Sequence, residues 1–354
     1  MAVTIYDIAK EAGVSIATVS RVFSGRARVA DPTRERVFAA ADQLGYEPNV
    51  SAQGLARQRT ELVSAVVPML TSYFFMEVIR GMQDRLSQSD HDLLVFTSRT
   101  PEHVDTQLAR AVQKGRADGL LLCSTPLTPQ RAESLKASGS PVVLVDSFHP
   151  DFDSVSVENR EGGYAATHHL LQAGHTRIAH IAPNPLSVPG VERRAGYQKA
   201  LRDAGLEGEN DLVIASDDTE QHGYTREAGY DAMRRLLALP DPPDAVFAAS
   251  DVQALGALKA VRDAGLRVPE DIAIVGFDDI RTSAYVGLST LRQPMYEMGK
   301  VAIDKLLHRI ADPERPVSHT TFSAQLMVRE TTGDKHILPS PRLHIDAAES
   351  EVPK

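Results

Sequence analysis

The stretch Thr4-Ile-Tyr-Asp-Ile-Ala-Lys-Glu-Ala-Gly-Val-Ser-Ile-Ala-Thr-Val-Ser-Arg21 predicts two short helices joined by a tight turn. Thr4 is a good N-cap residue, and Asp7 three positions later completes a variant of the capping box. Four apolar side chains recur at helical spacing on one face of the first helix, namely Ile5, Ile8, Ala9 and Ala12. Gly13 is expected to end that helix.

A second helix follows at once, because Ser15 can cap it while Val19 and Val22 point inward. The residues left around its exposed N-terminal end and flank are Ile16, Ala17, Thr18, Ser20 and Arg21. A helix, a short turn and a second helix make a helix-turn-helix unit, whose second helix enters the major groove of DNA. An ordinary helical hairpin is the alternative, since such pairs of helices are common.

A third helix is predicted from Asp31-Pro32, a capping residue followed by proline at the first helical position. Its apolar stripe consists of Val37, Ala40, Ala41 and Leu44, with Gly45 directly after it. Three helices of this length can enclose a small core.

Four motifs occur in order over this region: Thr4-Ile-x-Asp-Ile-Ala, Ala12-Gly-Val-Ser-x-Ala-Thr-Val-Ser-Arg-Val22, Thr33-Arg-Glu-Arg-Val37 and Leu44-Gly-Tyr-x-Pro-Asn49. Together they make the chain resemble the lactose/galactose-repressor (LacI/GalR) family of bacterial transcription regulators. The resemblance continues to about residue 330 and covers nearly everything except the tail.

The distribution of charge agrees with a DNA-binding N-terminus. The chain has 354 residues, which suits a small domain plus a larger one of two lobes, and its net charge of −9 argues at first against nucleic acid. Residues 1–60 nevertheless contain eight Lys/Arg and six Asp/Glu, a balance of +2, so the remainder carries −11. The positive charge is therefore local.

The single cysteine, Cys123, lies in the apolar run Leu120-Leu-Leu-Cys-Ser124, which predicts a buried strand thiol rather than a nucleophile. No stretch approaches the apolar length of a membrane span, and no basic segment followed by an apolar one begins the chain. We therefore expect a cytoplasmic protein without membrane contact.

Enzyme motifs are missing from the sequence: there is no G-x-G-x-x-G after a strand, no phosphate loop ending in Gly-Lys-Ser/Thr, no H-E-x-x-H and no G-x-S-x-G. His168-His169 is the one histidine doublet. Adjacent helical positions point about 100° apart, so these two side chains cannot readily share a metal and are predicted to be surface and semi-buried residues. We expect no catalytic residue, no cofactor and no metal.

Residues 46–60 form a short, mostly polar joint in which Asn49 can cap about two helical turns, although Gly54 weakens such a helix by about 0.5–1 kcal/mol relative to alanine. The resemblance implies a hinge helix that pairs with its dimer mate in the minor groove, with Leu55 as an apolar wedge and Ala52 as a further contact. A plain linker with one incidental leucine is the alternative.

From Leu62 onward, apolar strands alternate with helices, a pattern typical of parallel sheets built from βαβ units. The predicted strands are 62–67, 92–96, 119–123, 142–145, 178–181, 212–215, 245–249 and 272–276. The predicted helices are 75–86, 162–172, 193–204, 229–237 and 254–264. Eight strands split most simply into two doubly wound lobes with a boundary near residue 160, and segments 301–310 and 322–328 cross back to complete them.

Two such lobes leave a cleft between the carboxyl ends of their strands, where open α/β sheets bind ligands. The resemblance implies the same architecture, similar to periplasmic sugar-binding proteins. The predicted fold is thus a small all-α helix-turn-helix domain (1–48), a hinge helix or linker (49–60), an α/β two-lobed effector-binding and dimerisation domain (61–332) and a disordered tail (333–354). The tail lacks a leucine heptad for a coiled coil, so we expect a homodimer.

At the DNA-binding end, Arg21 is the one long basic side chain in the second helix, so it is the best candidate for a bidentate contact to guanine O6 and N7. Ile16 and Ala17 can offer apolar contact, for instance to thymine methyl groups. Phosphate contacts, which set the register without reading sequence, are predicted for Thr4, Ser15, Thr18 and Asn49. Arg28 is a further candidate, although a surface arginine is usually just solvated.

At the ligand end, the resemblance implies seven effector contacts: Phe74, Phe75, Asp146, Arg193, Tyr224, Ser250 and Asp278. Their chemistry suits a sugar, because aromatic rings lie against the CH face of a pyranose while Arg193 and the two aspartates form charged hydrogen bonds with hydroxyls. Both aspartates end apolar strands and are expected to face the cleft. For the Phe-Phe pair, a place in the core is the alternative.

Two departures from the family's pattern leave the ligand open. Ser72-Tyr-Phe-Phe75 stands where the family often has Asn-Pro-Phe-Phe, and Ser250-Asp251 stands where it has Asn-Asp. Both change the hydrogen-bonding groups near the pocket. A sugar is the expected effector, and a purine or a phosphorylated metabolite stays possible.

The sequence therefore predicts a dimeric transcription regulator, expected to be a repressor, that binds a pseudo-palindromic double-stranded DNA operator under the control of a small-molecule effector. Whether the effector releases or promotes DNA binding is not encoded in any motif. The alternatives are a cytoplasmic sugar-binding protein whose N-terminal helices dock a partner, and a regulator controlled by a protein co-regulator. Salt-sensitive, sequence-selective DNA binding separates the first alternative from the regulator.

Overall fold

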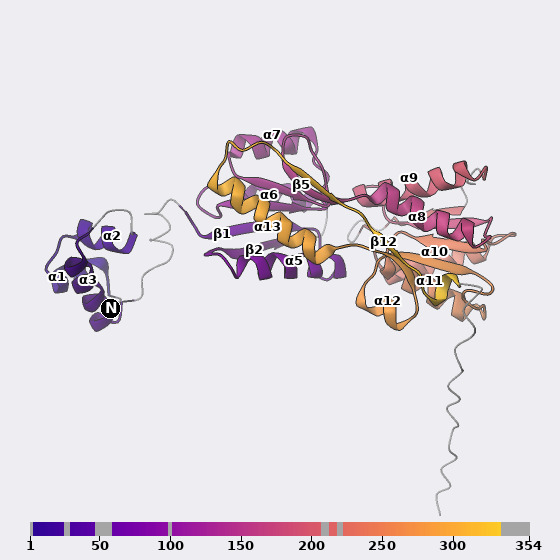
Figure 1. The fold of residues 1–354 in the computed structure, drawn as a ribbon, viewed down its shortest axis with the longest axis horizontal. Helices are drawn as coiled ribbons and strands as arrows, with labels where there is room; N and C mark the ends of the chain where they lie inside the picture. Colours follow the sequence, from indigo (N-terminus) through magenta and orange to yellow (C-terminus); the bar gives the residue numbers. More distant parts are fainter. Residues whose placement is uncertain are drawn as a thin grey trace, which may run out of the picture.

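A computed structural model describes residues 3–24, 29–46, 59–97, 101–206, 212–217 and 222–333 of the chain. Figure 1 shows a group of N-terminal helices followed by a body of two α/β lobes. The predicted tail (333–354) lies outside the described residues except for Gly333, and so do four candidate DNA contacts, Arg28, Asn49, Ala52 and Leu55.

The N-terminal unit consists of α1 (Ile5–Ala12), α2 (Ile16–Ser24) and α3 (Asp31–Leu44). The hydroxyl and the backbone N–H of Thr4 both donate to the Asp7 carboxylate, at 2.7 and 2.9 Å, as the capping-box variant predicted. Gly13 ends α1 with a φ of 64°. The backbone N–H of Thr18 donates to the Ser15 hydroxyl at 3.1 Å, so Ser15 caps α2 as predicted.

The core of this unit is the one that helical spacing predicted. Its buried members are Ile8, Ala9, Ala12, Val19, Val22, Val37, Ala40 and Ala41. The predicted cap of the third helix was wrong by one residue: Asp31 is the first helical residue and Ala30 occupies the N-cap position. Pro32 still lies in the first turn, where its missing N–H costs no helical hydrogen bond.

The first lobe is a parallel six-stranded sheet in the order β11-β5-β4-β3-β1-β2. Its strands are β1 (Leu62–Val67), β2 (Asp92–Thr97), β3 (Gly119–Cys123), β4 (Val142–Val145), β5 (Asp153–Val157) and β11 (His319–Phe322). One face packs against α5 (Tyr73–Leu86) and α13 (Met295–Ala311), and the other against α6 (Pro101–Ala111) and α7 (Pro129–Ser138). Figure 1 shows that α13, from late in the sequence, covers this early lobe.

The second lobe is a six-stranded sheet in the order β12-β10-β9-β8-β6-β7. Its strands are β6 (Ile178–Ala182), β7 (Val213–Ala215), β8 (Ala245–Ala248), β9 (Ala273–Asp278), β10 (Ser289–Arg292) and β12 (Gln325–Met327), of which β12 is antiparallel to β10. One face packs against α8 (Asn159–Gln172) and α9 (Val188–Asp203), and the other against α10 (Arg226–Leu237) and α11 (Asp251–Asp263). The short α12 (Arg281–Tyr285) and the 3-10 helix η2 (Glu330–Thr332) complete the lobe.

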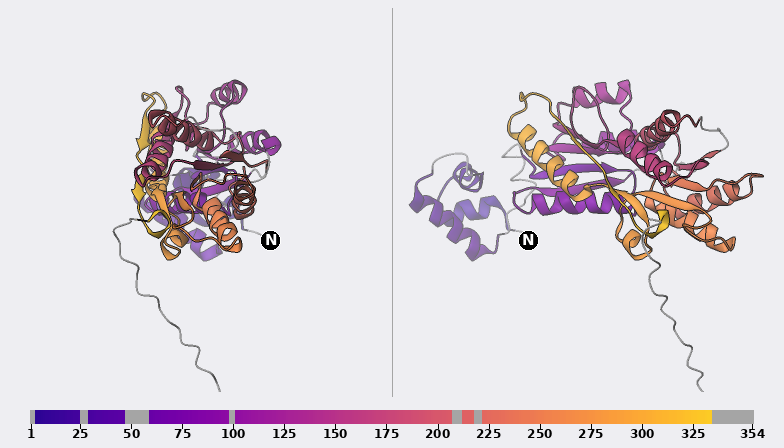
Figure 2. Two further views of the ribbon diagram at one scale, coloured as in Figure 1. Left: turned by 90° about the vertical axis from the view of Figure 1, so that its right-hand side faces the viewer. Right: turned by 45° about the vertical axis from the view of Figure 1, so that its right-hand side comes forward.

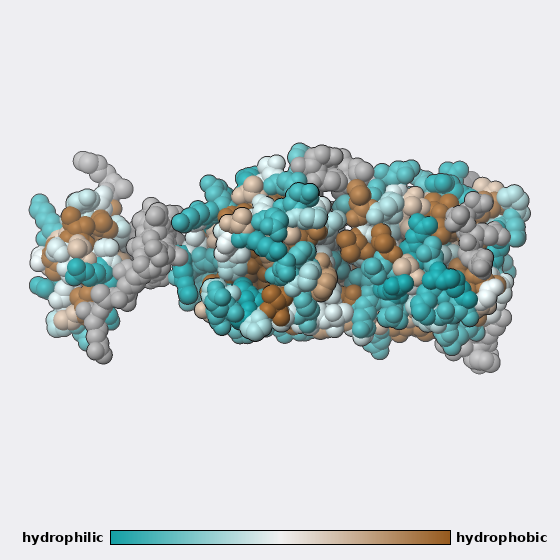
Figure 3. All heavy atoms as spheres, turned by 90° about the horizontal axis from the view of Figure 1, so that it is seen from above, coloured by the Kyte–Doolittle hydropathy of each residue, from teal (hydrophilic) through white to brown (hydrophobic). Residues whose placement is uncertain are grey.

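The chain passes between the lobes three times, from β5 to α8, from β10 to α13 and from β11 to β12 (Figures 1 and 2). Hydrophobic side chains are visible around the junction between the lobes in Figure 3. Because each sheet contains strands from both ends of this region, neither lobe is a continuous segment of sequence.

The segment predicted at 322–328 meets β11 only at its last residue, Phe322. Sequence periodicity missed two other strands entirely, β5 and β10, and three helices, α6, α7 and α12. The missed strands are short and carry hydroxyl residues that are fully buried, including Ser154, Ser289 and Thr290. The Ser289 hydroxyl pairs with that of Thr332 at 2.7 Å, and the Thr290 hydroxyl donates to Asp251 at 2.5 Å. These hydrogen bonds allow polar residues in a strand core that hydropathy alone does not detect.

Two glycines allow α8 and α9 to pack closely. A Cβ added to Gly163 would lie 2.1 Å from the backbone oxygen of Arg193, and one added to Gly196 would lie 2.0 Å from that of Arg160. The backbones of the two helices are therefore in contact at Arg193 of α9. This contact fixes the position from which the Arg193 side chain extends.

Gly163→Ala is expected to destabilise the body by about 1–3 kcal/mol, because the methyl group forces these backbones apart. Thermal unfolding followed by circular dichroism measures the loss. Arg202→Ala, at an exposed position of α9, is the control and should change stability by less than about 0.5 kcal/mol. Equal melting temperatures for the parent and Gly163→Ala would contradict the close packing.

Other predictions of burial can be compared with the structure. Cys123 is fully buried, as predicted, and burial raises the pKa of its thiol. The prediction for the histidine doublet was wrong in part, since both side chains are half-buried: His168 stacks on Tyr164, and His169 Nε2 lies 2.9 Å from the Thr332 hydroxyl. Within the described residues, no helix combines the length and the apolar character needed to cross a membrane.

Candidate functional site

The second helix of the N-terminal unit presents the predicted DNA-reading residues to solvent. Ile16 is 39% exposed, and Ala17 and Arg21 are exposed as well. Thr18 is half-buried, and its hydroxyl lies 2.9 Å from that of Ser15. Thr4 is exposed, and its hydroxyl donates a hydrogen bond to the Asp7 carboxylate. The exposed ridge on α2 has the geometry that insertion into a major groove requires.

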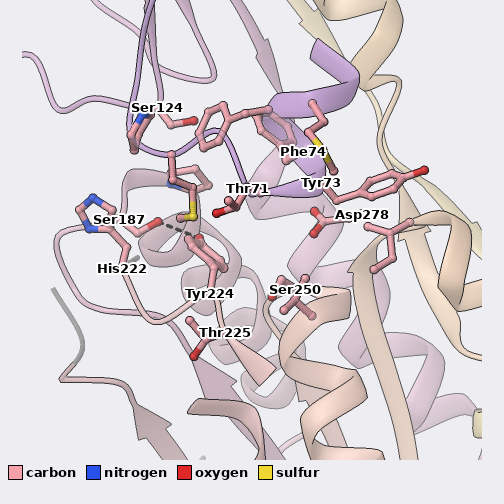
Figure 4. Close-up of a pocket in the computed structure, with 18 of the residues that line it drawn as sticks. Thr71, Tyr73, Phe74, Ser124, Ser187, His222, Tyr224, Thr225, Ser250 and Asp278 are labelled. Carbon is pink, nitrogen blue, oxygen red and sulfur yellow. Dashed lines mark hydrogen bonds between the residues drawn. The ribbon is translucent and has the colours of Figure 1, made fainter. Parts of the chain in front are cut away.

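The second site is a cavity of about 490 Å³ between the two lobes. It falls within the roughly 300–1,000 Å³ usual for small-molecule pockets. In Figure 4, Thr71 and Phe74 from the first lobe lie across the cavity from Ser187, Tyr224 and Ser250 from the second. All seven candidate effector residues line this cavity: Phe74, Phe75, Asp146, Arg193, Tyr224, Ser250 and Asp278.

Backbone strain is concentrated at the cavity. Six non-glycine residues of the described chain have positive φ, and four of them line the cavity, namely Ser124, Asp146, His222 and Asp278. Ser124 and Asp146 directly follow β3 and β4, and Asp278 ends β9. Such conformations cost of order 1–3 kcal/mol each and persist where the surrounding structure imposes them, as at binding sites.

Arg193 is the buried cation of the cavity, with 3% of the residue exposed. Its Nε donates to Asn159 Oδ1 at 2.8 Å, and one terminal nitrogen donates to the Ala249 carbonyl at 2.6 Å. The guanidinium lies over the Phe277 ring at 3.7 Å from its centroid. These contacts use two of its five N–H donors and hold the planar group in one orientation.

Two buried carboxylates stand near this cation. Asp278 Oδ1 is 3.9 Å from Arg193 and accepts a hydrogen bond from Gln293 Nε2 at 2.6 Å. Asp146 accepts one from the Ser124 hydroxyl at 2.6 Å, and its other oxygen, Oδ1, is buried with no hydrogen-bond partner in the described chain. Burial raises the pKa of both carboxyls, and Arg193 opposes that rise.

The remaining candidates supply aromatic and hydroxyl groups. The Tyr224 hydroxyl lies 2.7 Å from that of Ser187, and burial raises the pKa of Tyr224 to about 12, so it remains neutral. Phe74 and Phe75 form a T-shaped pair with ring centroids 5.1 Å apart. Phe75 is 6% exposed and also belongs to the first lobe's core, so the core alternative holds for it in part.

Ser250 has a structural task besides lining the cavity. Its hydroxyl accepts from the Gln253 backbone N–H at 3.3 Å, which caps α11, and lies 3.2 Å from Gln253 Oε1. The next residue, Asp251, is fully buried and accepts from Thr290, Ser283 and the backbone N–H of Ile280. The departure at Ser250-Asp251 therefore keeps the helix cap and leaves one lone pair of Ser250 for a ligand.

Sequence reasoning missed the residues that position the charged groups. Asn159 and Gln293, which bond Arg193 and Asp278, lie at two of the three crossings between the lobes. No motif marks either residue. Ser124 was detectable, because it follows the apolar run of β3 at the same sheet edge as Asp146.

Comparison with known proteins agrees with both parts of the chain. Residues 4–49 match the family of bacterial regulatory proteins named lacI, and residues 167–332 match the periplasmic binding protein-like domain. Catabolite control protein A of Priestia megaterium is 34% identical over 320 residues, which cover 89% of this chain and 94% of that protein.

Two solved structures are similar over nearly the whole chain. The complex of the transcriptional regulator CelR with cellobiose is 34% identical with a TM-score of 0.70, and the match covers 93% of this chain and 99% of that one. The Lac repressor dimer bound to operator and the anti-inducer ONPF is 28% identical with a TM-score of 0.78, over 94% of this chain and 99% of that one.

A helix-turn-helix unit attached to a two-lobed body with an interlobe cavity defines a DNA-binding transcription regulator with a ligand-binding domain. The chain belongs to the LacI family of bacterial regulatory proteins. This family consists of DNA-binding regulators and not of enzymes, as the sequence predicted.

Proposed function

We propose that the chain is a repressor whose affinity for a pseudo-palindromic operator is controlled by a sugar bound between the lobes. One observation carries this proposal: Asp146 Oδ1 is buried at the cavity, and no donor of the described residues makes a hydrogen bond of good geometry to it. An unpaired carboxylate oxygen in such a place costs free energy that a ligand hydroxyl relieves by donating to it.

The surrounding groups complete the recognition of a polyol. Arg193 donates to hydroxyl oxygens, whereas Asp278 and Asp146 accept from hydroxyl protons, so neighbouring hydroxyls of one ring are bound by groups of both kinds. Phe74, with Phe75 behind it in the T-shaped pair, offers aromatic surface for the CH groups of a pyranose. The cellobiose complex of the similar regulator CelR supports the same chemical class.

The charge balance of the cavity favours a neutral ligand over a phosphorylated one. Asp146 and Asp278 face a single buried cation, Arg193, and the two exposed charged residues of the lining, Arg226 and Glu227, offset each other. A phosphate group would meet repulsion from these carboxylates in a medium of low dielectric constant. A neutral sugar is therefore a better candidate ligand than a phosphorylated metabolite.

Binding between the lobes supplies a route to control. A ligand that contacts Phe74 of the first lobe and Asp278 of the second stabilises one interlobe angle over others. A coupling of about 1–3 kcal/mol changes DNA affinity 5- to 150-fold. The ligand weakens DNA binding if it stabilises an interlobe angle unfavourable for operator binding, and strengthens DNA binding if it stabilises the favourable angle.

We also propose a homodimer, in agreement with the dimeric Lac repressor that the chain resembles. Tyr285 on α12 is 89% exposed, and the adjacent Val286 is 41% exposed. Apolar side chains exposed side by side are typical of surfaces that bury on association. Analytical ultracentrifugation of the full chain and of Tyr285→Lys tests this assignment, which predicts a dimer that the substitution weakens.

A thermal-shift screen tests the proposed ligand class. Cellobiose, glucose, ribose, glucose 6-phosphate and adenine are compared at equal concentration. A bound ligand at 100 times its dissociation constant adds about 2.7 kcal/mol of stability. We expect stabilisation by a neutral sugar, confirmed by calorimetry and by a change in operator affinity. Stabilisation by the phosphate or the purine alone would overturn the sugar assignment, and operator release by a protein co-regulator without any small-molecule binding would overturn the cavity's role.

A further inference from the structure

The chain enters the two-lobed body through Thr60 and Glu61, and a single carboxylate holds both. The backbone N–H of Thr60 donates to Asp118 Oδ1 at 2.7 Å, and that of Glu61 donates to Oδ2 at 3.0 Å. The Thr60 hydroxyl donates to Oδ1 at 2.9 Å. Three hydrogen bonds to an ionised acceptor are among the stronger polar contacts in a protein.

We call Asp118, together with the Thr60 and Glu61 groups that it binds, the first clamp. This clamp is part of the first sheet. Asp118 directly precedes β3, and its backbone N–H donates to the carbonyl of Leu62, the first residue of β1, at 2.8 Å. Its side chain is 9% exposed, and His91 Nε2 lies 3.5 Å from Oδ2. The carboxylate is therefore fixed where the neighbouring strands β1 and β3 begin.

The backbone that Asp118 holds is strained. Glu61 has a φ of 55°, a left-handed conformation that costs a non-glycine residue free energy. The five other non-glycine residues of positive φ in the described chain line the cavity or, for Asp279, follow one that does. Glu61 is the exception, and its place is where the segment from the helix-turn-helix unit arrives.

The second lobe contains a looser copy of the same arrangement. Asp244, directly before β8, accepts from the backbone N–H groups of Thr176 and Arg177 at 3.1 and 3.2 Å, ahead of β6. His175 Nδ1 lies 3.6 Å from Asp244, whose side chain is 42% exposed. Each clamp holds the two residues that precede the first strand of its lobe, so holding a strand start is a task common to both. That task does not explain why the first clamp has shorter hydrogen bonds, a more buried carboxylate and an additional hydroxyl donor.

We propose that Asp118 is a positioning residue for DNA binding, which fixes the end of the segment between the helix-turn-helix unit and the body and transmits the state of the first lobe to that unit. A segment anchored at a defined point and direction has fewer conformations to lose when the helix-turn-helix unit binds DNA. The proposal rests on the DNA binding of the family and is independent of the identity of the effector.

Asp118→Ala and Asp118→Asn test this role in the full-length chain. The DNA is a duplex obtained by in vitro selection against the parent protein, and affinity is measured by fluorescence anisotropy. Each residue released from the anchor is expected to weaken binding roughly 5- to 30-fold, with asparagine intermediate because it keeps one acceptor oxygen. The salt dependence should stay unchanged, because no phosphate contact is removed.

Asp244→Ala and Asp244→Asn are the matched controls. They remove the equivalent clamp of the second lobe and report what general destabilisation does to DNA affinity. We expect comparable losses of thermal stability in both pairs, weaker DNA binding for the Asp118 pair alone, and faster hydrogen exchange at Thr60 and Glu61. Equal DNA affinities in the two pairs, or parental affinity in the Asp118 variants, would overturn the proposal.

Milder variants keep the test decisive if the Asp118 variants do not fold. Thr60→Val removes one hydroxyl donor from the first clamp, and Thr176→Val changes the corresponding position of the second. We expect Thr60→Val to weaken DNA binding and Thr176→Val to leave it at the parental value. The reverse order, or no difference, counts against Asp118. Because no sugar is used, a negative sugar screen leaves this result standing.

Discussion

Arg193→Ala is expected to weaken effector binding roughly 30-fold or more, because a buried, hydrogen-bonded charge is removed from between two carboxylates. Operator affinity without effector should stay close to that of the parent. Titration calorimetry with the best sugar from the screen gives the first quantity, and fluorescence anisotropy gives the second. An unchanged sugar affinity would exclude Arg193 from the binding site.

The same variant has a predicted pH dependence. Without Arg193, the pKa values of buried Asp146 and Asp278 rise further above the unfolded values. A carboxyl with a raised pKa in the folded state takes up its proton more readily there, so folding is favoured at low pH and loses stability as pH rises through the folded pKa. Arg193→Ala should therefore lose more stability relative to the parent at pH 8 than at pH 5.

Two controls separate binding from packing at this site. Arg194→Ala removes the adjacent, half-buried arginine, which does not line the cavity, and should leave sugar affinity unchanged. Arg193→Lys keeps the charge but loses the planar fork that bonds Asn159 and Ala249, so its affinity should be intermediate.

Arg21→Ala is expected to cost about 1–3 kcal/mol of operator binding and to relax specificity at one base position of each half-site. Arg21 is the exposed basic residue of α2, on the same surface as Ile16 and Ala17. Binding to a library of operators with single base changes measures the effect. A uniform loss over all sequences would instead identify Arg21 as a phosphate contact.

Arg34→Ala is the matched control for Arg21. Arg34 is an exposed arginine of α3 that lies 3.9 Å from Asp31, outside the second helix. Its removal takes the same charge from the same small unit, so it should alter salt-dependent affinity at most and leave the base preference unchanged. A change in base preference would place α3 in the reading surface.

Much of this organisation could be predicted because it depends on short-range pattern. Apolar spacing located α1 to α3, caps placed the starts of α1 and α2, and apolar runs located β1 to β4. The resemblance placed all seven effector candidates at what proved to be one cavity, although residues as far apart as Phe74 and Asp278 line it.

The remainder depends on long-range pairing, which local pattern does not carry. Gln293 reaches Asp278 only after the chain has turned through α12 and β10. Asp118 meets Thr60 through the adjacency of β1 and β3, which are separated by α5, β2 and α6 in the sequence. Polar residues of this kind look like ordinary surface residues until the sheet order is known.

The three passages between the lobes limit how the molecule can move. One connecting strand would permit rotation in any direction and also sliding, whereas three side by side resist sliding and leave bending about a shared axis as the soft motion. Asn159 and Gln293 lie at two of these passages and bond the charged groups of the cavity, Arg193 and Asp278. A ligand bound in the cavity therefore changes mainly one angle, the angle between the two lobes. The first lobe carries this change to β1, the strand that follows Glu61.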